Sequence, residues 1–196
     1  ECLLEKYIGQ KIIDAENPWK TLEEFEYYKN YWDLSRLEYL NLTFYWDIKS
    51  ILFLWGGALP LTAILLAKNY KISSTIIDYH REAYEIWKQL IETLGIQDLI
   101  QYSYWDAYSY HDIKKYDACY IAALVWQEEE KQRQLLKYIS SSIKAELFVL
   151  RSSHGTRELL YKKVSLWIVR EFLQIEHIIH TKNHLIRSII IAKKYD

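Results

Sequence analysis

The stretch that decides the fold is SILFLWGGALPLTAILLAK, residues 50–68. Its apolar run at 51–54 is short enough for a strand that is buried on both faces. Gly56 and Gly57 interrupt this run, and Pro60 follows where a helix can begin without the N–H that proline lacks. A strand, a glycine turn and a helix in this order predict the first unit of a Rossmann-like, nucleotide-binding α/β sheet.

An acidic residue after the next strand supports a nucleotide site. The second predicted strand, at 73–78, ends in Asp78, 22 residues after Gly56. In sheets of this kind an acidic residue about 20 residues after the glycine turn holds the ribose hydroxyls. Glycine turn, spacing and acid together predict a site that includes Gly56, Gly57 and Asp78.

Strands and helices alternate along the rest of the chain. Further strands are expected at 100–104, 116–125, 144–151, 171–179 and 184–193. Helices are expected at 22–31, opened by a capping box of Thr21 and Glu24, and at 60–69, 81–94, 127–140 and 156–169. This alternation predicts a mostly parallel sheet with right-handed crossovers. The last two strands have a short link, which favours a terminal antiparallel hairpin, as in the S-adenosylmethionine-dependent methyltransferase fold.

Composition narrows the function classes. With 196 residues and a net charge of -1, the chain fits one α/β domain with a small appendage and gives no electrostatic reason to expect nucleic acid. No run reaches about 18 unbroken apolar residues, so no membrane span is expected. Cys2 and Cys119 cannot form a disulfide framework, which favours a cytoplasmic location. The chain begins with Glu1 and contains no methionine, so we expect a truncated N-terminal helical cap at 1–48 before a Rossmann-like domain at 49–196.

Five motifs in order resemble those of the nicotianamine synthase family. They are residues 25–39 (FPYYxNYxxLTRLEY in the family), 53–62 (FVGSGPLPLT), 116–125 (YDVVFLAALV), 150–161 (LRSAHGARxFLY) and 188–193 (SVIIAxK). The resemblance implies a methyltransferase-like domain that moves 3-amino-3-carboxypropyl groups from S-adenosylmethionine to an amine and releases methylthioadenosine. The expected product is a metal-chelating metallophore.

The resemblance also implies roles for individual residues. Glu38 would be the base that removes a proton from the attacking amine, because an ammonium has no lone pair. The residues expected to bind the substrate are Tyr27, Tyr28, Tyr31, Ile64, Arg151, Ser153 and His154. Those expected to bind S-adenosylmethionine are Gly56, Gly57, Asp78, Trp105, Asp106, Ala122, Ala123 and Leu124. In this set Asp78 would hold the ribose and Asp106 the adenine amine.

Four positions depart from the family pattern. Trp55 stands at the first loop glycine, Ala58 at a proline, and Trp126 at a glycine. Ile64 stands where several family members have a tyrosine near the substrate. An apolar pair at 55 and 64 is expected to narrow the acceptor pocket and to reduce the number of transfers.

Several alternatives stay open. The chain also fits an opine-metallophore synthase that adds one aminobutyrate to histidine, a small-molecule methyltransferase, or a binding module without activity. His177, His180 and His184 are spaced nearly like metal ligands, but they fall across a strand and a turn, so no protein-bound metal is expected. The acceptor is expected to be a small amine or amino acid, and the oligomeric state stays open, with a homodimer among the alternatives.

Overall fold

A computed structural model describes residues 2–110, 114–126, 128–153, 162–181 and 188–195. These residues form a 7-stranded sheet in the order β3-β2-β1-β4-β5-β7-β6. The strands are β1 Ser50–Leu54, β2 Ser73–Asp78, β3 Ile100–Tyr104, β4 Tyr116–Ile121, β5 Ala145–Ser152, β6 Gln174–His180 and β7 Ser188–Lys193. β1 to β5 pair in parallel, and β7 pairs antiparallel with both β5 and β6. The predicted parallel sheet with an antiparallel terminal pair is confirmed.

β1, the strand that leads into the glycine turn, is an inner strand of the sheet. β1 lies between β2 and β4, with Leu52 opposite Thr75 on one side and Cys119 on the other. Residues 51–54 are all buried, because helices cover both faces of the sheet at this point. The strand order reverses direction between β1 and β4, which is where open α/β sheets bind their ligands.

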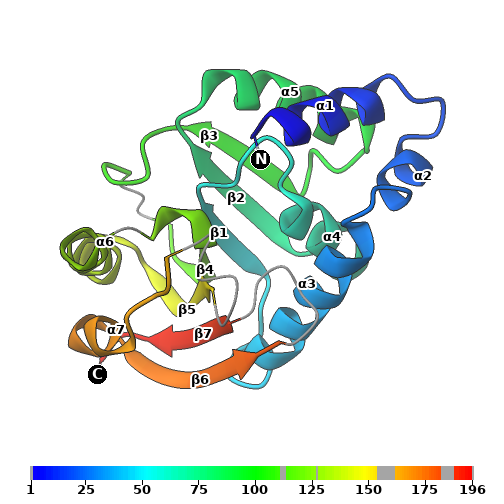
Figure 1. Ribbon diagram of the computed structural model, residues 1–196. Coiled ribbons are helices and arrows are strands. Elements are labelled where there is room, and N and C mark those ends of the chain that lie inside the picture. The colour runs from blue at the N-terminus through cyan, green and yellow to red at the C-terminus, as the bar shows by residue number, and fades with distance from the viewer. Residues whose placement is uncertain (1, 111–113, 127, 154–161, 182–187, 196) are drawn as a thin grey trace.

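Helices cover the two faces of the sheet (Figure 1). The helices are α1 Cys2–Ile13, α2 Pro18–Glu23, α3 Tyr28–Leu42, α4 Leu61–Tyr70, α5 Arg81–Thr93, α6 Glu129–Ser142 and α7 Leu166–Phe172, with a short 3₁₀ helix η1 at Ala123–Val125. Residues of α1 to α5 share one core cluster with the sheet, and residues of α6 and α7 share the other. None of the helices in the described part of the chain is long and apolar enough to cross a membrane.

The N-terminal helices α1, α2 and α3 pack in the same core cluster as α4, α5 and one face of the sheet. Ile12, Leu22, Leu34 and Leu42 are buried in the same cluster as residues of β1, β2 and β4. This packing places Tyr31 of α3 at a pocket on the carboxyl edge of the sheet and Glu38 beside Arg151, and the start of α1 contacts the turn after β1 through Glu5. The N-terminal segment therefore supplies side chains to that edge.

Some predicted boundaries are wrong. The predicted helix 22–31 is split, because α2 begins at Pro18 and ends at Glu23, and α3 begins only at Tyr28. Thr21 and Glu24 do not form a capping box; the Asn17 side chain caps α2 instead by accepting from Lys20 N at 3.1 Å. The apolar run after β4 turns into η1, so that strand is four residues shorter than predicted. Residues 162–165 are not helical, and 154–161 lie outside the described residues.

Candidate functional site

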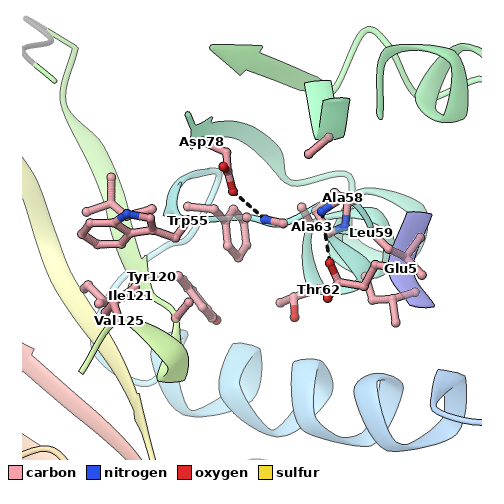
Figure 2. A pocket seen from close by; sticks show the side chains of 18 of the residues that line it. Glu5, Trp55, Ala58, Leu59, Thr62, Ala63, Asp78, Tyr120, Ile121 and Val125 are labelled. Atoms are coloured by element: carbon pink, nitrogen blue, oxygen red, sulfur yellow. Dashed lines mark hydrogen bonds between the residues drawn. The ribbon is translucent and has the colours of Figure 1, made fainter. Parts of the chain in front are cut away.

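A cavity of about 430 Å³ opens at the carboxyl ends of β1, β2 and β4. Its lining comes from the β1–α4 turn, the start of α4, the end of β2, the end of β4 with η1, and single residues of α1, α3 and β5 (Figure 2). The lining includes Glu5, Tyr31, Trp55, Gly56, Gly57, Ala58, Thr62, Asp78, His80, Tyr108, Tyr120, Ala122, Ala123 and Arg151. The pocket therefore collects residues that are far apart in the sequence.

The glycine turn leaves no room for side chains. A Cβ at Gly56 would collide with Cγ2 of Ile76 on the neighbouring strand. Gly57 has φ +70, and a Cβ there would lie 2.7 Å from Oε2 of Glu5. Both glycines are thus required where they stand, and the turn presents its backbone to the pocket.

Asp78 fixes this turn from the end of β2. Its Oδ2 accepts a hydrogen bond from Gly57 N at 2.9 Å, and its Oδ1 accepts from His80 N at 3.0 Å. The His80 ring contacts the same Oδ1 through Nδ1, also at 3.0 Å. A carboxylate has about four lone-pair sites, so Asp78 keeps capacity for a ligand hydroxyl. The sequence predicted this residue from spacing alone, and the structure places it beside the glycine turn.

Glu5 reaches the same turn from α1. Its Oε2 accepts from Ala58 N at 3.1 Å, so a carboxylate lies against the glycine turn (Figure 2). Glu5 could not be predicted from the sequence, because nothing local connects a helix at 2–13 with a turn more than 50 residues later.

Trp55 occupies a strained backbone position in the turn. Its φ is 60, a left-handed conformation that bulky residues rarely adopt. Its N–H donates to Ile77 O at 2.8 Å, and its ring packs edge-on against Tyr108 with centroids 5.3 Å apart. The left-handed geometry explains why the family pattern has glycine here, and the indole forms part of the pocket wall.

An ion pair lies against the other side of the pocket. Arg151 of β5 donates to Glu38 of α3 through Nε to Oε1 at 2.8 Å and Nη2 to Oε2 at 2.7 Å. The same Nη2 donates to the Thr62 hydroxyl at 2.7 Å. Glu38 is completely buried, and the Arg151 side chain is 12% exposed. Burial acts to lower the pKa of Arg151, but the Glu38 carboxylate outweighs it and the net pKa is raised, so the guanidinium stays charged.

Two tyrosines complete this side. Tyr31 of α3 lines the pocket and lies within electrostatic range of Arg151. Tyr120 of β4 places its ring under the Arg151 guanidinium, 5.4 Å from its carbon to the ring centroid. Burial first, and the nearby Glu38 charge second, raise the pKa of Tyr120 well above its usual value, so its phenol stays neutral. Tyr120 was not predicted as a site residue, although this chain has tyrosine at this position of the 116–125 motif, where the family has phenylalanine.

The structure brings many of the predicted residues together, but not all of them. Gly56, Gly57, Asp78, Ala122, Ala123, Tyr31 and Arg151 line the pocket, and Glu38 is bonded to Arg151. The lining does not include Glu38, Trp105, Asp106, Tyr27, Tyr28, Ile64 or Ser153, and Glu38 reaches the pocket only through its bonds to Arg151. The side chain of Leu124 and all of His154 lie outside the described residues.

The residues outside the lining have other surroundings. Ile64 is completely buried in the core, Tyr28 packs against the same core cluster, and the Tyr27 ring stacks edge-on with Phe25. Trp105 is half exposed, and Asp106 is exposed and accepts from Tyr108 N at 3.0 Å. Ser153 is buried after the end of β5. Their predicted roles are not supported by a place in this pocket.

The described residues contain no group of three or more His, Cys, Asp or Glu that could hold a metal. His177 and His180 lie in β6, where His180 Nδ1 is 3.0 Å from Ser188 Oγ. His184 lies outside the described residues.

Comparison with known proteins gives one consistent family. The family model described as "Nicotianamine synthase protein" matches residues 1–196. Relatives include the nicotianamine synthase of Solanum lycopersicum, 28% identical with 99% of this chain and 63% of the relative covered, and nicotianamine synthase 3 of Arabidopsis thaliana, 29% identical with 92% and 58% covered. The chain thus spans about three fifths of the length of the curated relatives it matches.

Solved structures agree on the fold. A glutamate-to-glutamine variant of MtNAS superposes with a TM-score of 0.84 at 24% identity, covering 100% of this chain and 71% of the other. The N-methyltransferase NodS from Bradyrhizobium japonicum, in complex with S-adenosyl-L-homocysteine, gives a TM-score of 0.64 at 12% identity, with 98% and 99% covered. These similarities show a Rossmann-like S-adenosylmethionine-dependent methyltransferase fold.

Proposed function

Because the chain belongs to the nicotianamine synthase family, we propose that it transfers the 3-amino-3-carboxypropyl group of S-adenosylmethionine to a small amine or amino acid. The released product is methylthioadenosine, and the product that keeps the transferred groups is a metal-chelating metallophore. The observation that carries this proposal is a buried Glu38–Arg151 pair against the same pocket as the glycine turn and Asp78. MtNAS has been solved with MTA and tNA, and its glutamate-to-glutamine variant with S-adenosylmethionine, which supports the choice of donor.

The glycine-turn side of the pocket suits the donor. Gly56 and Gly57 allow a ligand to approach the backbone, and Asp78 retains acceptor capacity for the ribose hydroxyls. Glu5 places a carboxylate at this turn, where it can attract the ammonium of a methionine moiety. The rings of Trp55 and Tyr108 form an aromatic wall of the pocket, where β1 ends.

The chemistry depends on which carbon faces the acceptor. S-adenosylmethionine, when bound, supplies a sulfonium with three electrophilic carbons. Transfer forms a bond from the acceptor nitrogen to the γ carbon of the aminocarboxypropyl group and breaks the bond from that carbon to sulfur, which keeps the electron pair. The pocket walls must therefore hold the γ carbon, and not the methyl group, toward the acceptor.

Glu38 and Arg151 would act on the acceptor side. An attacking amine must lose a proton, and Glu38 is the carboxylate bonded to Arg151, which lines this part of the pocket. Both Glu38 oxygens already accept from Arg151, so they can hold an ammonium only through their remaining lone pairs. Arg151 orients the carboxylate through its two hydrogen bonds, and the Thr62 hydroxyl accepts a hydrogen bond from the same guanidinium. This arrangement would draw the ammonium in and take its proton first, so that the free amine can then attack the γ carbon.

The acceptor, the cellular location and the oligomeric state are part of the same proposal. The acceptor is a small amine or amino acid, the setting is the cytoplasm, and assembly as a homodimer is a further expectation. An opine-type transfer of a single aminobutyrate to histidine would use the same pocket. A methyltransferase would use the Gly56–Asp78 side but would not need the Glu38–Arg151 pair.

Mass spectrometry of the products tests the proposal. The protein is incubated with S-adenosylmethionine alone and then with added L-amino acids, histidine included. We expect new products that carry one or more aminobutyrate units. Products that gain only methyl groups would contradict the proposal and favour the methyltransferase alternative.

A further inference from the structure

The hydroxyl of Tyr120, a residue that lines the pocket, forms no hydrogen bond within the described part of the chain. Tyr120 is 2% exposed, and its hydroxyl oxygen is fully buried without a hydrogen-bond partner among the described residues. An unsatisfied buried hydroxyl destabilises the folded protein, and such groups are rare enough in proteins to need an explanation. Because Tyr120 lines the pocket, a bound ligand can supply the missing partner.

The surroundings of this hydroxyl define the ligand group. Tyr120 extends from β4 into the pocket, toward the side on which Thr62 lies (Figure 2). Its ring lies under the Arg151 guanidinium and 4.8 Å from the Phe53 ring, measured between centroids. The hydroxyl is therefore beside the Glu38–Arg151 pair, which presents one negative and one positive charge.

A neutral phenol in this place is a hydrogen-bond donor. Burial first, and the Glu38 charge second, raise the pKa of Tyr120, so the proton stays on the oxygen. A donor beside a guanidinium suits a carboxylate, whereas Glu38 suits an ammonium. An α-amino acid carries both groups and matches the charges on this side of the pocket.

The hydroxyl also distinguishes this chain from the family pattern. The motif that matches residues 116–125 has phenylalanine where this chain has Tyr120. A phenylalanine would fill the same space next to Phe53 and would leave no buried polar atom. The added oxygen has a cost in the folded protein and no compensation within it, which favours a role in binding.

We infer that the Tyr120 hydroxyl donates a hydrogen bond to the carboxylate of the acceptor amino acid and sets the selectivity for that acceptor. This inference rests on the proposed transfer reaction and names a binding residue for its acceptor.

The test compares Tyr120→Phe with a matched control, Tyr102→Phe. Tyr102 is a partly buried tyrosine on β3 that packs against Trp87 and does not line the pocket. Calorimetry measures the Kd of nicotianamine in the presence of saturating methylthioadenosine, and the Kd of methylthioadenosine by itself. Melting temperatures of both variants are recorded alongside.

Tyr120→Phe should raise the Kd of nicotianamine about 10- to 100-fold, the range for one hydrogen bond to a charged group. Its Kd for methylthioadenosine and its melting temperature should not worsen, because the lost hydroxyl has no partner in the fold. Tyr102→Phe should leave both Kd values unchanged. An unchanged Kd of nicotianamine in Tyr120→Phe, or a melting temperature that falls with it, would overturn the inference.

The failure of the proposed function has a different signature. If the unaltered protein binds nicotianamine in a Tyr120-dependent manner but forms no methylthioadenosine, the inference stands and the reaction is wrong. If it forms methylthioadenosine but Tyr120→Phe leaves the Kd of nicotianamine unchanged, the reaction stands and the acceptor role of Tyr120 is overturned.

Discussion

Arg151 grips Glu38 with two parallel hydrogen bonds, Nε to Oε1 at 2.8 Å and Nη2 to Oε2 at 2.7 Å, across 113 positions of the chain. Bidentate pairs of this kind are strong and directional. The pair joins α3 to β5, and its arginine lines the pocket. Any change at Glu38 therefore affects both stability and chemistry, and the two effects must be separated.

Glu38→Gln should slow transfer about 10²- to 10⁴-fold at neutral pH, because glutamine cannot take a proton. The loss should shrink as the pH rises, since more of the acceptor amine is then unprotonated without help. Initial rates of methylthioadenosine formation across pH check this. A variant with the wild-type rate at every pH would show that Glu38 has only a structural role.

The same substitution should lower stability by about 3–5 kcal/mol, because it leaves the Arg151 charge buried without its counter-ion. Arg151→Met alone should cost a similar amount, whereas the double variant Glu38→Gln/Arg151→Met should cost clearly less than the sum. Urea denaturation of the three variants measures this coupling. Additive losses would mean that the two side chains do not form the pair.

Trp55→Gly should cost less stability than the loss of an indole ring usually does. Relief of the left-handed backbone gains about 1–2 kcal/mol, which partly offsets the lost packing of the ring on the core and the edge-on contact with Tyr108, itself worth about 0.5–1.5 kcal/mol. Trp55→Ala loses the same ring and keeps the strain, so it should be the less stable of the two. Thermal denaturation decides between them, and equal stability would contradict the strain argument.

Trp55→Gly should also shift products toward a larger number of transfers, because the indole is part of the pocket wall. Ile64→Tyr would restore the residue that several family members have at the other departing position. That side chain is completely buried in the core, where a larger ring costs about 1–3 kcal/mol, so the change at Trp55 is the cleaner test. Full-length nicotianamine from the unaltered protein would show that neither residue limits the number of transfers.

The fold could be predicted from sequence because its decisive signals are local. The bounds of β2 and β3 match the prediction, since short apolar runs there end at polar or turn residues. The helix bounds around residues 25–39 could not be predicted in this way, because rings and charges alternate there without a clean apolar face. The break between α2 and α3 was therefore not predicted.

The site was predictable only in part for a related reason. Asp78 follows a spacing rule, but Glu5, Tyr120 and the pairing of Glu38 with Arg151 arise from tertiary packing between distant segments. The orientation of Ile64 was not readable either. Residues 61–67 of α4 are all buried, so the sequence carries no periodic contrast that shows which side faces the pocket.

Asp78→Ala should weaken binding of methylthioadenosine about 10- to 100-fold, because it removes the ribose acceptor and the bonds that fix Gly57 and His80. Asp106→Ala should have a much smaller effect, because Asp106 is exposed and outside the pocket lining. Calorimetry with methylthioadenosine compares the two. Undiminished binding by the Asp78 variant would remove the donor from this side of the pocket.

Glu5→Ala should weaken S-adenosylmethionine about tenfold and leave methylthioadenosine unaffected, because only the former carries the ammonium that Glu5 can attract at the glycine turn. Glu85→Ala, at an exposed position on α5, is the control and should change neither Kd. Equal losses for both ligands would assign Glu5 to support of the turn and not to recognition of the amino acid.

The most direct test of the central claim is the identity of the by-product formed from S-adenosylmethionine. The protein is incubated with S-adenosylmethionine, and the nucleosides are separated by chromatography against standards of methylthioadenosine and S-adenosylhomocysteine, with Glu38→Gln run in parallel. Aminocarboxypropyl transfer predicts methylthioadenosine from the unaltered protein and far less of it from the variant. S-Adenosylhomocysteine as the by-product, at a rate that Glu38→Gln does not change, would contradict the account and identify a methyltransferase.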